Sequence, residues 1–309
     1  MLTIFSIPKP FTGHSAIIQR NAIQSWLKIK PRCEIILCGN EQGVAGVASE
    51  FNVHHIPDIE KNKYGTPLLS AAFRVVQRKA DSTLIGYVNS DIIILNDAID
   101  TLKVIPFRRF LLLGQRWNLD INDPVDYGCS SWEKELREKL INKGDLQPPF
   151  GSDYFIFPKD IIWDFPEFAV GRPGWDNWII YRARAFKIPV IDATDVGTVI
   201  HQNHNYAHIP KGVAPSLFEG PEAVKNRQLM GGEDYSFNLR DATHRLTGKS
   251  IKKALDYQNL AYRLKRQPVL NSSKGLYTKF RVRFLSALLY RRQYFPKWLW
   301  QNMIYSLTI

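Results

Sequence analysis

Residues 2–95 alternate between short apolar runs and segments in which apolar residues recur at helical spacing. Strands separated by helices at this rhythm favour a parallel sheet with helices on both faces. The expected strands cover residues 2–7, 33–38, 53–56 and 84–95, and the expected helices cover residues 17–27, 43–51 and 66–77. The pattern therefore predicts an α/β fold with a mostly parallel central sheet, in which ligands bind beyond the carboxyl ends of the strands.

The second half of the chain is less regular. Thr66 and Pro67 are expected to open the last helix of the first half as N-cap and first-turn residues. Further expected elements are strands at 110–114 and 189–191, helices at 132–143 and 178–185, a loop-like region at 201–232 and a helical tail from about residue 250. No internal repeat is visible.

Composition indicates a folded globular protein, because 45% of the 309 residues are hydrophobic and 12% are aromatic. The three cysteines, Cys33, Cys38 and Cys129, are too few and too scattered for a disulfide scaffold or a zinc site. We therefore expect a reducing, cytoplasmic setting. The first residues lack the basic region and cleavage site of a signal peptide, and no apolar run is long enough to span a membrane.

Positive charge is concentrated at the end of the chain. Residues 245–309 contain 14 lysines and arginines against one acid, Asp256, so the net positive charge of this segment is larger than the +12 of the whole chain. The rest of the chain is almost neutral. We expect a catalytic domain at 1–245 and a basic, aromatic-rich helical extension at 246–309, and such asymmetry suggests an anionic partner for the extension.

The triplet Asn89-Ser90-Asp91 interrupts the apolar run between Val88 and Ile92. In an extended chain alternate side chains share a face, so the first and third members of the triplet would point the same way. Two oxygen-bearing side chains on one side of a strand can hold Mg²⁺ or Mn²⁺. The alternative interpretation is a polar break where a buried strand ends.

Four segments in this order resemble the nucleotide-diphospho-sugar transferases of the GT-A fold, particularly bacterial glycosyltransferases that assemble surface polysaccharides. The segments are Ile7-Pro8-Lys9-Pro10-Phe11, Tyr87-Val88-Asn89-Ser90-Asp91, Gly174-Trp175-Asp176-Asn177-Trp178 and His201-Gln202-Asn203-His204. The resemblance covers roughly residues 1–240. It implies a GT-A-like, Rossmann-like sheet flanked by helices, and a Mn²⁺ or Mg²⁺ cofactor that bridges the protein to a diphosphate.

The resemblance implies Asp91 as the firmer metal ligand and His201 as the histidine that completes the metal site. Asn89 departs from the Asp-any-Asp pattern of the family, and a neutral amide binds a cation more weakly than a carboxylate. Asn89 is therefore expected either as a weaker ligand or as a contact to the ribose. The alternative for His201 is a loop histidine bonded to backbone, and His204 and His208 are the weaker candidates.

The resemblance also implies that Asp176 is the catalytic base of an inverting transfer, placed under the acceptor hydroxyl. Its aromatic neighbours would desolvate it and raise its pKa toward working pH. The alternative is an ordinary N-cap aspartate before a helix. Asp153 is expected as the runner-up base or as a ligand of the acceptor hydroxyl, and a retaining course is the alternative mechanism.

Donor contacts are expected from Pro8 and Lys9 in the turn after the first strand, and from Ser90 beside the metal ligand. Arg116 and Trp117 are expected in the sugar site, because aromatic faces stack on sugars, although Trp117 fits a core position nearly as well. Residues 19–21 are interpreted either as diphosphate contacts or as a solvated helix face.

The expected function is transfer of a sugar from a nucleoside-diphosphate donor to a hydroxyl of a glycan or lipid-linked acceptor. The alternatives are an inactive carbohydrate- or lipid-binding module on the same fold and a sugar nucleotidyltransferase. The latter usually carries a Gly-rich basic loop after the first strand, and residues 7–13 hold one glycine. The almost neutral body argues against a nucleic-acid partner.

The basic extension combines cationic and apolar side chains. Arginines and lysines attract anionic lipid, and tryptophan, phenylalanine and leucine insert into its interface. Its apolar residues include Phe280, Phe284, Leu285, Leu288, Leu289, Trp298, Leu299, Trp300, Met303, Ile304 and Leu307. We therefore expect a protein that sits on the inner face of the membrane through this extension, with packing of the apolar stripe on the catalytic domain as the alternative.

Overall fold

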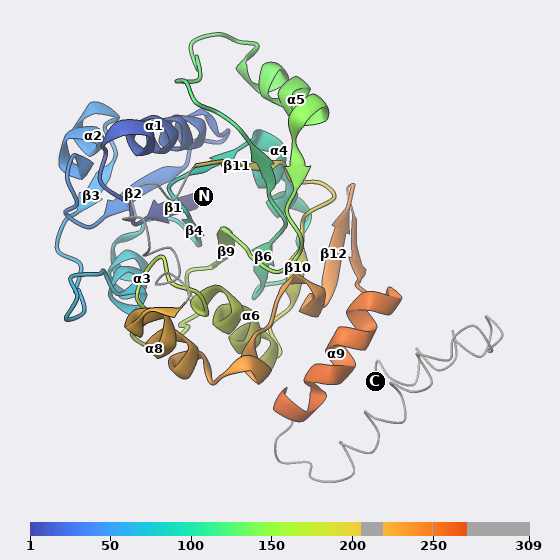
Figure 1. Ribbon diagram of the computed structural model, residues 1–309. Helices are drawn as coiled ribbons and strands as arrows, with labels where there is room; N and C mark the ends of the chain where they lie inside the picture. The colour runs from blue at the N-terminus through green and yellow to red at the C-terminus, as the bar shows by residue number, and fades with distance from the viewer. Residues whose placement is uncertain (205–218, 249, 271–309) are drawn as a thin grey trace.

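The computed structural model describes residues 1–204, 219–248 and 250–270. The strands of its main sheet are β1 (Leu2–Ser6), β2 (Glu34–Cys38), β3 (His54–Ile56), β4 (Leu84–Val88), β6 (Leu111–Leu113), β9 (Tyr154–Pro158), β10 (Val190–Asp192), β12 (His244–Thr247) and β13 (Ser250–Lys253). Within the described residues they lie in the order β13-β12-β10-β6-β9-β4-β1-β2-β3 (Figure 1). β9 runs antiparallel to β4 and β6, β13 runs antiparallel to β12, and the other pairs are parallel.

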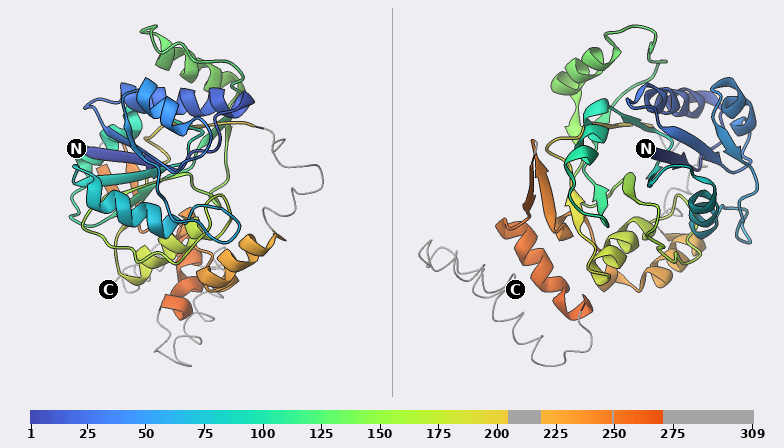
Figure 2. Two further views of the ribbon diagram at one scale, coloured as in Figure 1. Left: turned by 90° about the vertical axis from the view of Figure 1, so that its left-hand side faces the viewer. Right: turned by 180° about the vertical axis from the view of Figure 1, so that it is seen from behind.

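Helices cover both faces of this sheet (Figures 1 and 2). One face packs against α1 (Gly13–Lys28), α2 (Val44–Glu50) and α4 (Asn96–Asp100), which is followed by the 3₁₀ turn η1 (Thr101–Val104). The other face packs against α3 (Leu69–Lys79) and α6 (Trp175–Ala185). A mostly parallel sheet between two layers of helices confirms the expected α/β class.

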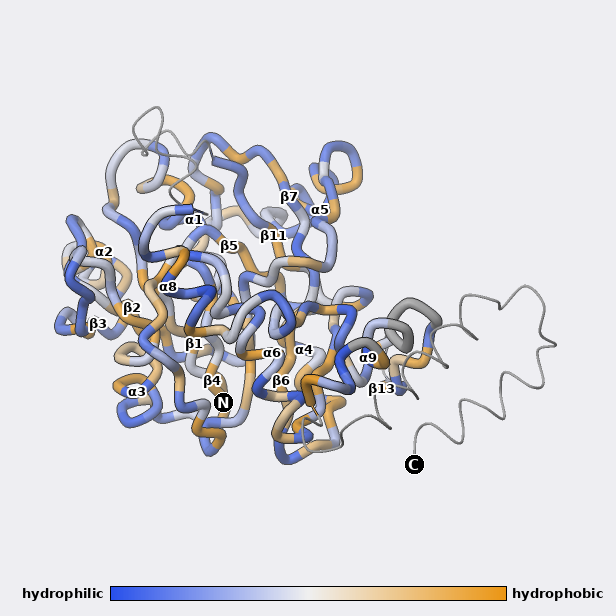
Figure 3. The backbone as a smooth tube through the Cα atoms, turned by 60° about the horizontal axis from the view of Figure 1, so that its bottom comes forward, coloured by the Kyte–Doolittle hydropathy of each residue, from blue (hydrophilic) through white to orange (hydrophobic). Residues whose placement is uncertain are grey.

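A second, smaller sheet lies beside the main one. Its strands are β5 (Ile92–Ile94), β7 (Trp117–Leu119), β8 (Asp145–Leu146) and β11 (Val199–Gln202), in the order β5-β11-β7-β8. Helix α5 (Trp132–Lys143) packs on it through Trp132, Leu136 and Leu140, which follow one another at four-residue spacing and so share one face. Figure 3 shows α5 alternating between hydrophilic and hydrophobic residues, as this one-sided packing requires.

The prediction of one continuous strand at 84–95 is wrong. β4 ends at Val88, the chain turns with the Ile92 amide donating to the Asn89 carbonyl over 3.1 Å, and β5 then joins the second sheet. Both flanking runs are buried and apolar, so periodicity did not reveal the break between them. Asn89 and Asp91 therefore lie in a turn at the end of β4, and the argument from alternate faces of a strand does not apply to them.

Two helix starts also differ from the expectation. The helix expected from Thr66 begins at Leu69, because a tight turn ties Thr66 to Asn62 through both backbone and side chain. The helix expected from residue 178 begins at Trp175, directly after Gly174, whose φ of 112° favours glycine at this turn. Asp176 consequently lies within the first turn of α6.

The region expected to be a loop at 201–232 contains the end of β11 and the helix α8 (Pro221–Met230). Two 3₁₀ turns follow, η2 (Glu233–Tyr235) and η3 (Leu239–Asp241). The helical tail expected from residue 250 begins instead with β13, and α9 (Tyr257–Leu270) follows. The domain boundary expected between residues 245 and 246 falls inside β12.

The apolar stripe of the extension, from Phe280 onward, lies outside the described residues. None of the helices in the described parts of the chain is long and apolar enough to cross a membrane.

Phe73 in α3 packs against one face of the main sheet. Its ring contacts those of Phe5, Tyr87, Phe157 and Phe165 at centroid distances of 4.1 to 6.0 Å. Phe73→Ala is expected to lower the free energy of unfolding by about 3–5 kcal/mol, because it leaves a cavity among these rings. Denaturant unfolding measures this. The exposed Ile141 offers a control, since Ile141→Ala should change stability by less than about 0.5 kcal/mol. Equal effects of the two changes would contradict this packing.

Candidate active site

A cavity of about 640 Å³ opens where the carboxyl ends of the parallel strands meet. In the left view of Figure 2, β1 runs from the marked N-terminus at the left toward this end of the sheet. The turns after β1, β4 and β6, the start of β9 and the first turn of α6 all contribute to its wall. The lining includes Pro8, Lys9, Glu41, Asn89, Ser90, Asp91, Arg116, Asp153, Arg172, Trp175, Asp176, His201 and His204.

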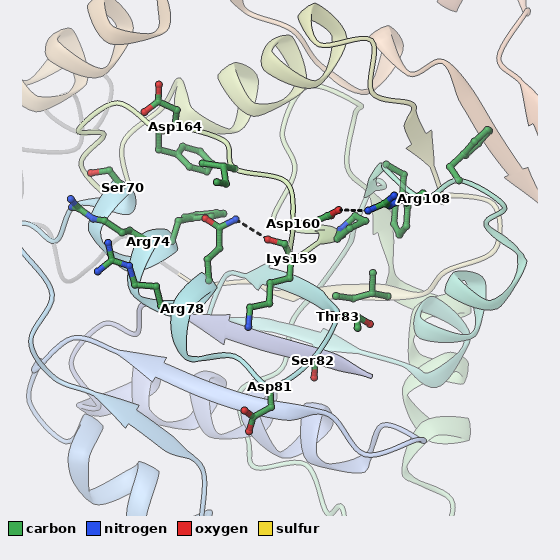
Figure 4. A pocket seen from close by; sticks show the side chains of 18 of the residues that line it. Ser70, Arg74, Arg78, Asp81, Ser82, Thr83, Arg108, Lys159, Asp160 and Asp164 are labelled. Atoms are coloured by element: carbon green, nitrogen blue, oxygen red, sulfur yellow. Dashed lines mark hydrogen bonds and ion pairs between the residues drawn. The ribbon is translucent and has the colours of Figure 1, made fainter.

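A larger cavity, of about 1200 Å³, lies at the opposite end of the strands and is shown in Figure 4. Its wall carries cations and carboxylates in similar number, and several of these are engaged with each other or with neighbouring groups. Arg108 pairs with Asp160, and Arg74 pairs with Glu60. In the described residues, groups of metal-ligating side chains are found only at the smaller cavity. We therefore assign the active site to the smaller cavity.

The antiparallel pairing of β4 with β9 determines where Asp153 lies. Val88, the last residue of β4, pairs with Tyr154, the first residue of β9. The residues just outside each strand then meet: the Asn89 amide donates to the Asp153 carbonyl over 2.9 Å, and Asn89 Nδ2 donates to Asp153 Oδ1 over 2.7 Å. The Gly-Ser-Asp segment is thereby placed beside the triplet.

The pairing of β5 with β11 brings the histidines to the same point. His201 lies opposite Ile92, and the Gln202 amide donates to the Asp91 carbonyl over 3.3 Å. His204 Nε2 lies 3.1 Å and His201 Nε2 3.9 Å from Asp91 Oδ2. One ligand atom from each of the three residues falls within 4.8 Å of the others. The structure therefore places His204, the weaker sequence candidate, closer to the Asp91 carboxylate than His201.

The electrostatics of this group fit a divalent cation. Burial acts to raise the pKa of Asp91, but the hydrogen bond from His204 and the charges of His201 and Lys9 hold it well below its usual range. Burial lowers the pKa of His201, which favours the neutral ring that binds metals. Asp91 Oδ1 and His201 Nδ1 are buried and have no hydrogen-bond partner in the described residues. Two imidazole nitrogens and a carboxylate can bind a metal ion in place of the protons that they would otherwise share.

Buried amide side chains fix the backbone of the triplet, and the sequence interpretation missed them. Gln202 is fully buried, and its Nε2 donates to the carbonyls of Ile18 and Asp91. Gln19 accepts from the Ser90 hydroxyl over 2.7 Å and from the Lys9 amide over 2.8 Å. The sequence offered only a glutamine between apolar residues of α1 and another at the end of an apolar strand, which is a weak signal.

Residues 19–21 therefore do not share one role. Asn21 Nδ2 donates to Gln202 Oε1 over 3.0 Å inside the protein, whereas Arg20 pairs with Glu50 at the surface. Within α1, Gln19 and Asn21 are structural, and Arg20 lies on a solvated face.

Arg116 and Trp117 are separated by the structure. Arg116 lines the cavity and pairs with Asp153, whose other oxygen accepts from Asn89. Trp117 begins β7, opposite Ile200. It packs against the apolar residues between the second sheet and α5 and does not line the cavity. Both oxygens of Asp153 are thus occupied, and its charge is balanced by a neighbouring guanidinium.

Asp176 has a different environment. Its side chain faces the cavity from the first turn of α6, and its Oδ1 accepts from the Gly174 amide at 3.3 Å. Burial raises its pKa to about 6, the charge of Asp153 acts in the same direction, and backbone amides at the helix start oppose the shift. No cation pairs with Asp176 among the described residues. A carboxylate with this pKa is suited to accept a proton near neutral pH.

No protein-family model matches the sequence, and no curated protein gives a significant match. Solved structures give matches of low identity. S. aureus TarS 1-349 in complex with UDP-GlcNAc has 14% identity and a TM-score of 0.48, with 89% of this chain and 75% of that chain covered. A mannosyltransferase from Pyrobaculum calidifontis in complex with GDP-Man and Mn²⁺ has 13% identity and a TM-score of 0.42, with 99% and 84% covered.

Glucosyl-3-phosphoglycerate synthase from Mycobacterium tuberculosis, in complex with Mn²⁺, UDP and phosphoglyceric acid, also has 13% identity and a TM-score of 0.42, with 75% of this chain and 79% of that chain covered.

The Asp-His-His group makes a direct prediction about metal affinity. His204→Ala is expected to weaken Mn²⁺ binding roughly tenfold or more, because it removes one of three ligands that the protein can offer. Titration calorimetry or Mn²⁺ electron paramagnetic resonance measures this. His55→Ala is a matched control, since His55 Nε2 donates to the Gly39 carbonyl, away from the Asp-His-His group. Unchanged affinity in the His204 variant would exclude it from the site.

Proposed function

We propose that the protein is a glycosyltransferase that moves a sugar from a nucleoside-diphosphate donor to a hydroxyl of a glycan or lipid-linked acceptor. The observation that carries this proposal is the meeting, in one cavity, of a metal-competent Asp-His-His group and an unpaired carboxylate of raised pKa. A metal ion can balance the negative charge of a leaving diphosphate, and the carboxylate can accept the proton of an attacking hydroxyl.

Donor binding is assigned to the side of the cavity around the triplet. Asp91, His201 and His204 would hold Mn²⁺ or Mg²⁺, which supplies positive charge opposite the diphosphate as it leaves. Pro8 and Lys9 line the same wall, so the Lys9 ammonium lies where it can approach a phosphate. Ser90 lines the same wall; its hydroxyl donates to Gln19, so its oxygen is left to accept a hydrogen bond from the donor.

Asp176 is the better candidate for the base. Asp153 already accepts hydrogen bonds from Arg116 and Asn89, one at each carboxylate oxygen, so both oxygens are engaged before an acceptor hydroxyl arrives. In the described residues the hydrogen bonds to Asp176 come from backbone amides, and burial desolvates its carboxylate. In the proposed reaction Asp176 accepts the proton of the acceptor hydroxyl as oxygen attacks the anomeric carbon, so the product has inverted configuration.

Asp176→Asn should reduce transfer by roughly 10²–10⁴-fold, the usual contribution of general base catalysis, while donor and Mn²⁺ binding stay within about twofold. The substitution keeps size and hydrogen bonding but cannot accept the proton. Product formation and donor affinity are measured on the same preparation. Asp160→Asn, at the opposite end of the sheet, should have no effect. Nearly full transfer by the Asp176 variant would reject the base assignment.

The raised pKa of Asp176 also predicts a pH profile. A base works in its ionised form, so kcat/KM should fall about tenfold per pH unit below a pH of about 6 and level off above it. The pH dependence of kcat/KM at limiting donor and saturating acceptor is the measurement. A profile whose acidic limb lies near pH 4, the range of an unshifted carboxyl group, would contradict this environment.

Membrane association is proposed on sequence, since residues 271–309 contain seven lysines and arginines and no acidic residue. Each basic side chain near an anionic surface contributes about 1 kcal/mol. The full chain should float with vesicles that contain phosphatidylglycerol but not with phosphatidylcholine vesicles, and truncation after Leu270 should abolish flotation. Equal flotation of the two chains would rule out an anchor in the removed segment.

A further inference from the structure

An exposed aromatic ring stands at the edge of the active-site cavity. Phe150 directly precedes Gly151, Ser152 and Asp153, which line the cavity, and 52% of its surface is exposed. The covered part of its ring packs against the guanidinium of Arg240. The exposed part of the ring is open to a ligand that approaches the cavity.

Arg240 lies between two aromatic rings at this edge. Its guanidinium carbon lies 4.8 Å from the ring centre of Phe150 and 5.1 Å from that of Tyr262, and its Nη1 donates to the Tyr262 hydroxyl over 3.1 Å. In the portion of the chain that the structure describes, no carboxylate forms an ion pair with Arg240. The rings thus hold the guanidinium in place without neutralising it.

Two contacts connect this stack, defined as Phe150, Arg240 and Tyr262, to the catalytic residues. The Leu239 amide donates to the Pro149 carbonyl over 3.2 Å, and Asn177 Nδ2 donates to the Phe237 carbonyl over 2.7 Å. Asn177 follows the proposed base Asp176 in the first turn of α6. The segment that carries Arg240 is therefore hydrogen-bonded to the first turn of α6, and Phe150 leads directly into the cavity lining.

Positive charge exceeds negative charge behind the stack. Asp241 directly follows Arg240 in the chain. Arg184 donates to the Asp241 carbonyl, and Arg266 Nε lies 3.7 Å from the Asp241 carboxylate. Burial and the charge of Arg263 lower the pKa of Arg184 to about 10. The fully buried Asp241 carboxylate thus faces the positive charges of Arg184, Arg263 and Arg266. Such a surplus raises the local concentration of anions.

We propose that Phe150, Arg240 and Tyr262 form the entrance to the acceptor site, and that the acceptor is a sugar or polyol chain carrying phosphate or carboxylate groups. This inference rests on the proposed function. Guanidinium groups bind phosphate and carboxylate through paired hydrogen bonds, and aromatic rings restrict how the guanidinium turns. The exposed part of the Phe150 ring offers an apolar surface to the chain itself.

The experiment uses the full chain saturated with Mn²⁺ and with the nucleoside diphosphate that it binds, so that anionic probes cannot occupy the diphosphate site. The probes are a glycerol phosphate oligomer, a hyaluronan oligosaccharide and a neutral dextran of similar length. Binding is measured by calorimetry at two salt concentrations. The wild-type protein should bind at least one anionic probe more tightly than dextran, and the preferred probe distinguishes phosphate from carboxylate.

Arg240→Gln should weaken binding of the preferred anionic probe roughly tenfold to a hundredfold, the usual range for a lost hydrogen bond to a charged group, and leave dextran binding unchanged. Arg240→Lys should restore part of the affinity, which a purely structural role would not do. Arg108→Gln, an exposed arginine at the other end of the sheet, is the control.

Equal binding of dextran and both anionic probes, or equal affinity of the wild-type and Arg240→Gln proteins, would overturn the inference. Hydrolysis of the donor by the wild-type protein separates this failure from that of the proposed function. A protein that hydrolyses a nucleotide sugar but shows no anionic preference would retain the proposed function and lose this inference. A protein that neither binds nor hydrolyses any donor would lose both.

Discussion

The active site depends on the buried side chain of Gln202. Its amide joins the carbonyl of Asp91 to α1, and its oxygen accepts from Asn21, so one residue fixes the turn between the two sheets. Gln202 also follows His201 in β11. The carboxylate and the imidazole of the proposed metal site are therefore positioned by the same buried network. Buried amides with every bond made are costly to rearrange, which gives the site a single geometry.

Two aspartates of the cavity show how environment separates roles. Asp153 faces Arg116 and Asn89 and is held as a paired anion, whereas Asp176 is desolvated, lacks a cation and feels the charge of Asp153. Besides burial, it is the charge of Asp153 that raises the pKa of Asp176, and we infer that Arg116, by pairing with Asp153, limits this repulsion.

The sequence predicted the alternation of strands and helices, because this alternation depends on local pattern, whereas the metal-ligand role of Asp91 stays a prediction. The sequence did not predict the break after Val88 or the approach of His204 to Asp91, since these depend on the pairing of β5 with β11, more than a hundred residues apart. Helix α8 could have been found: Gly220 and Pro221 are typical of a helix start. The buried roles of Gln19 in α1 and Gln202 in β11 require the tertiary packing, because polar residues in a helix or at a strand end usually indicate solvent.

The central claim is that a divalent cation and a nucleoside diphosphate meet at Asp91, His201 and His204. Anomalous X-ray diffraction at the manganese edge, from crystals grown with Mn²⁺ and the nucleoside diphosphate, tests it most directly. One strong peak within coordinating distance of these three side chains and of a diphosphate oxygen is the expected result. A peak elsewhere in the molecule, or a diphosphate bound without any ion at this group, would contradict the account.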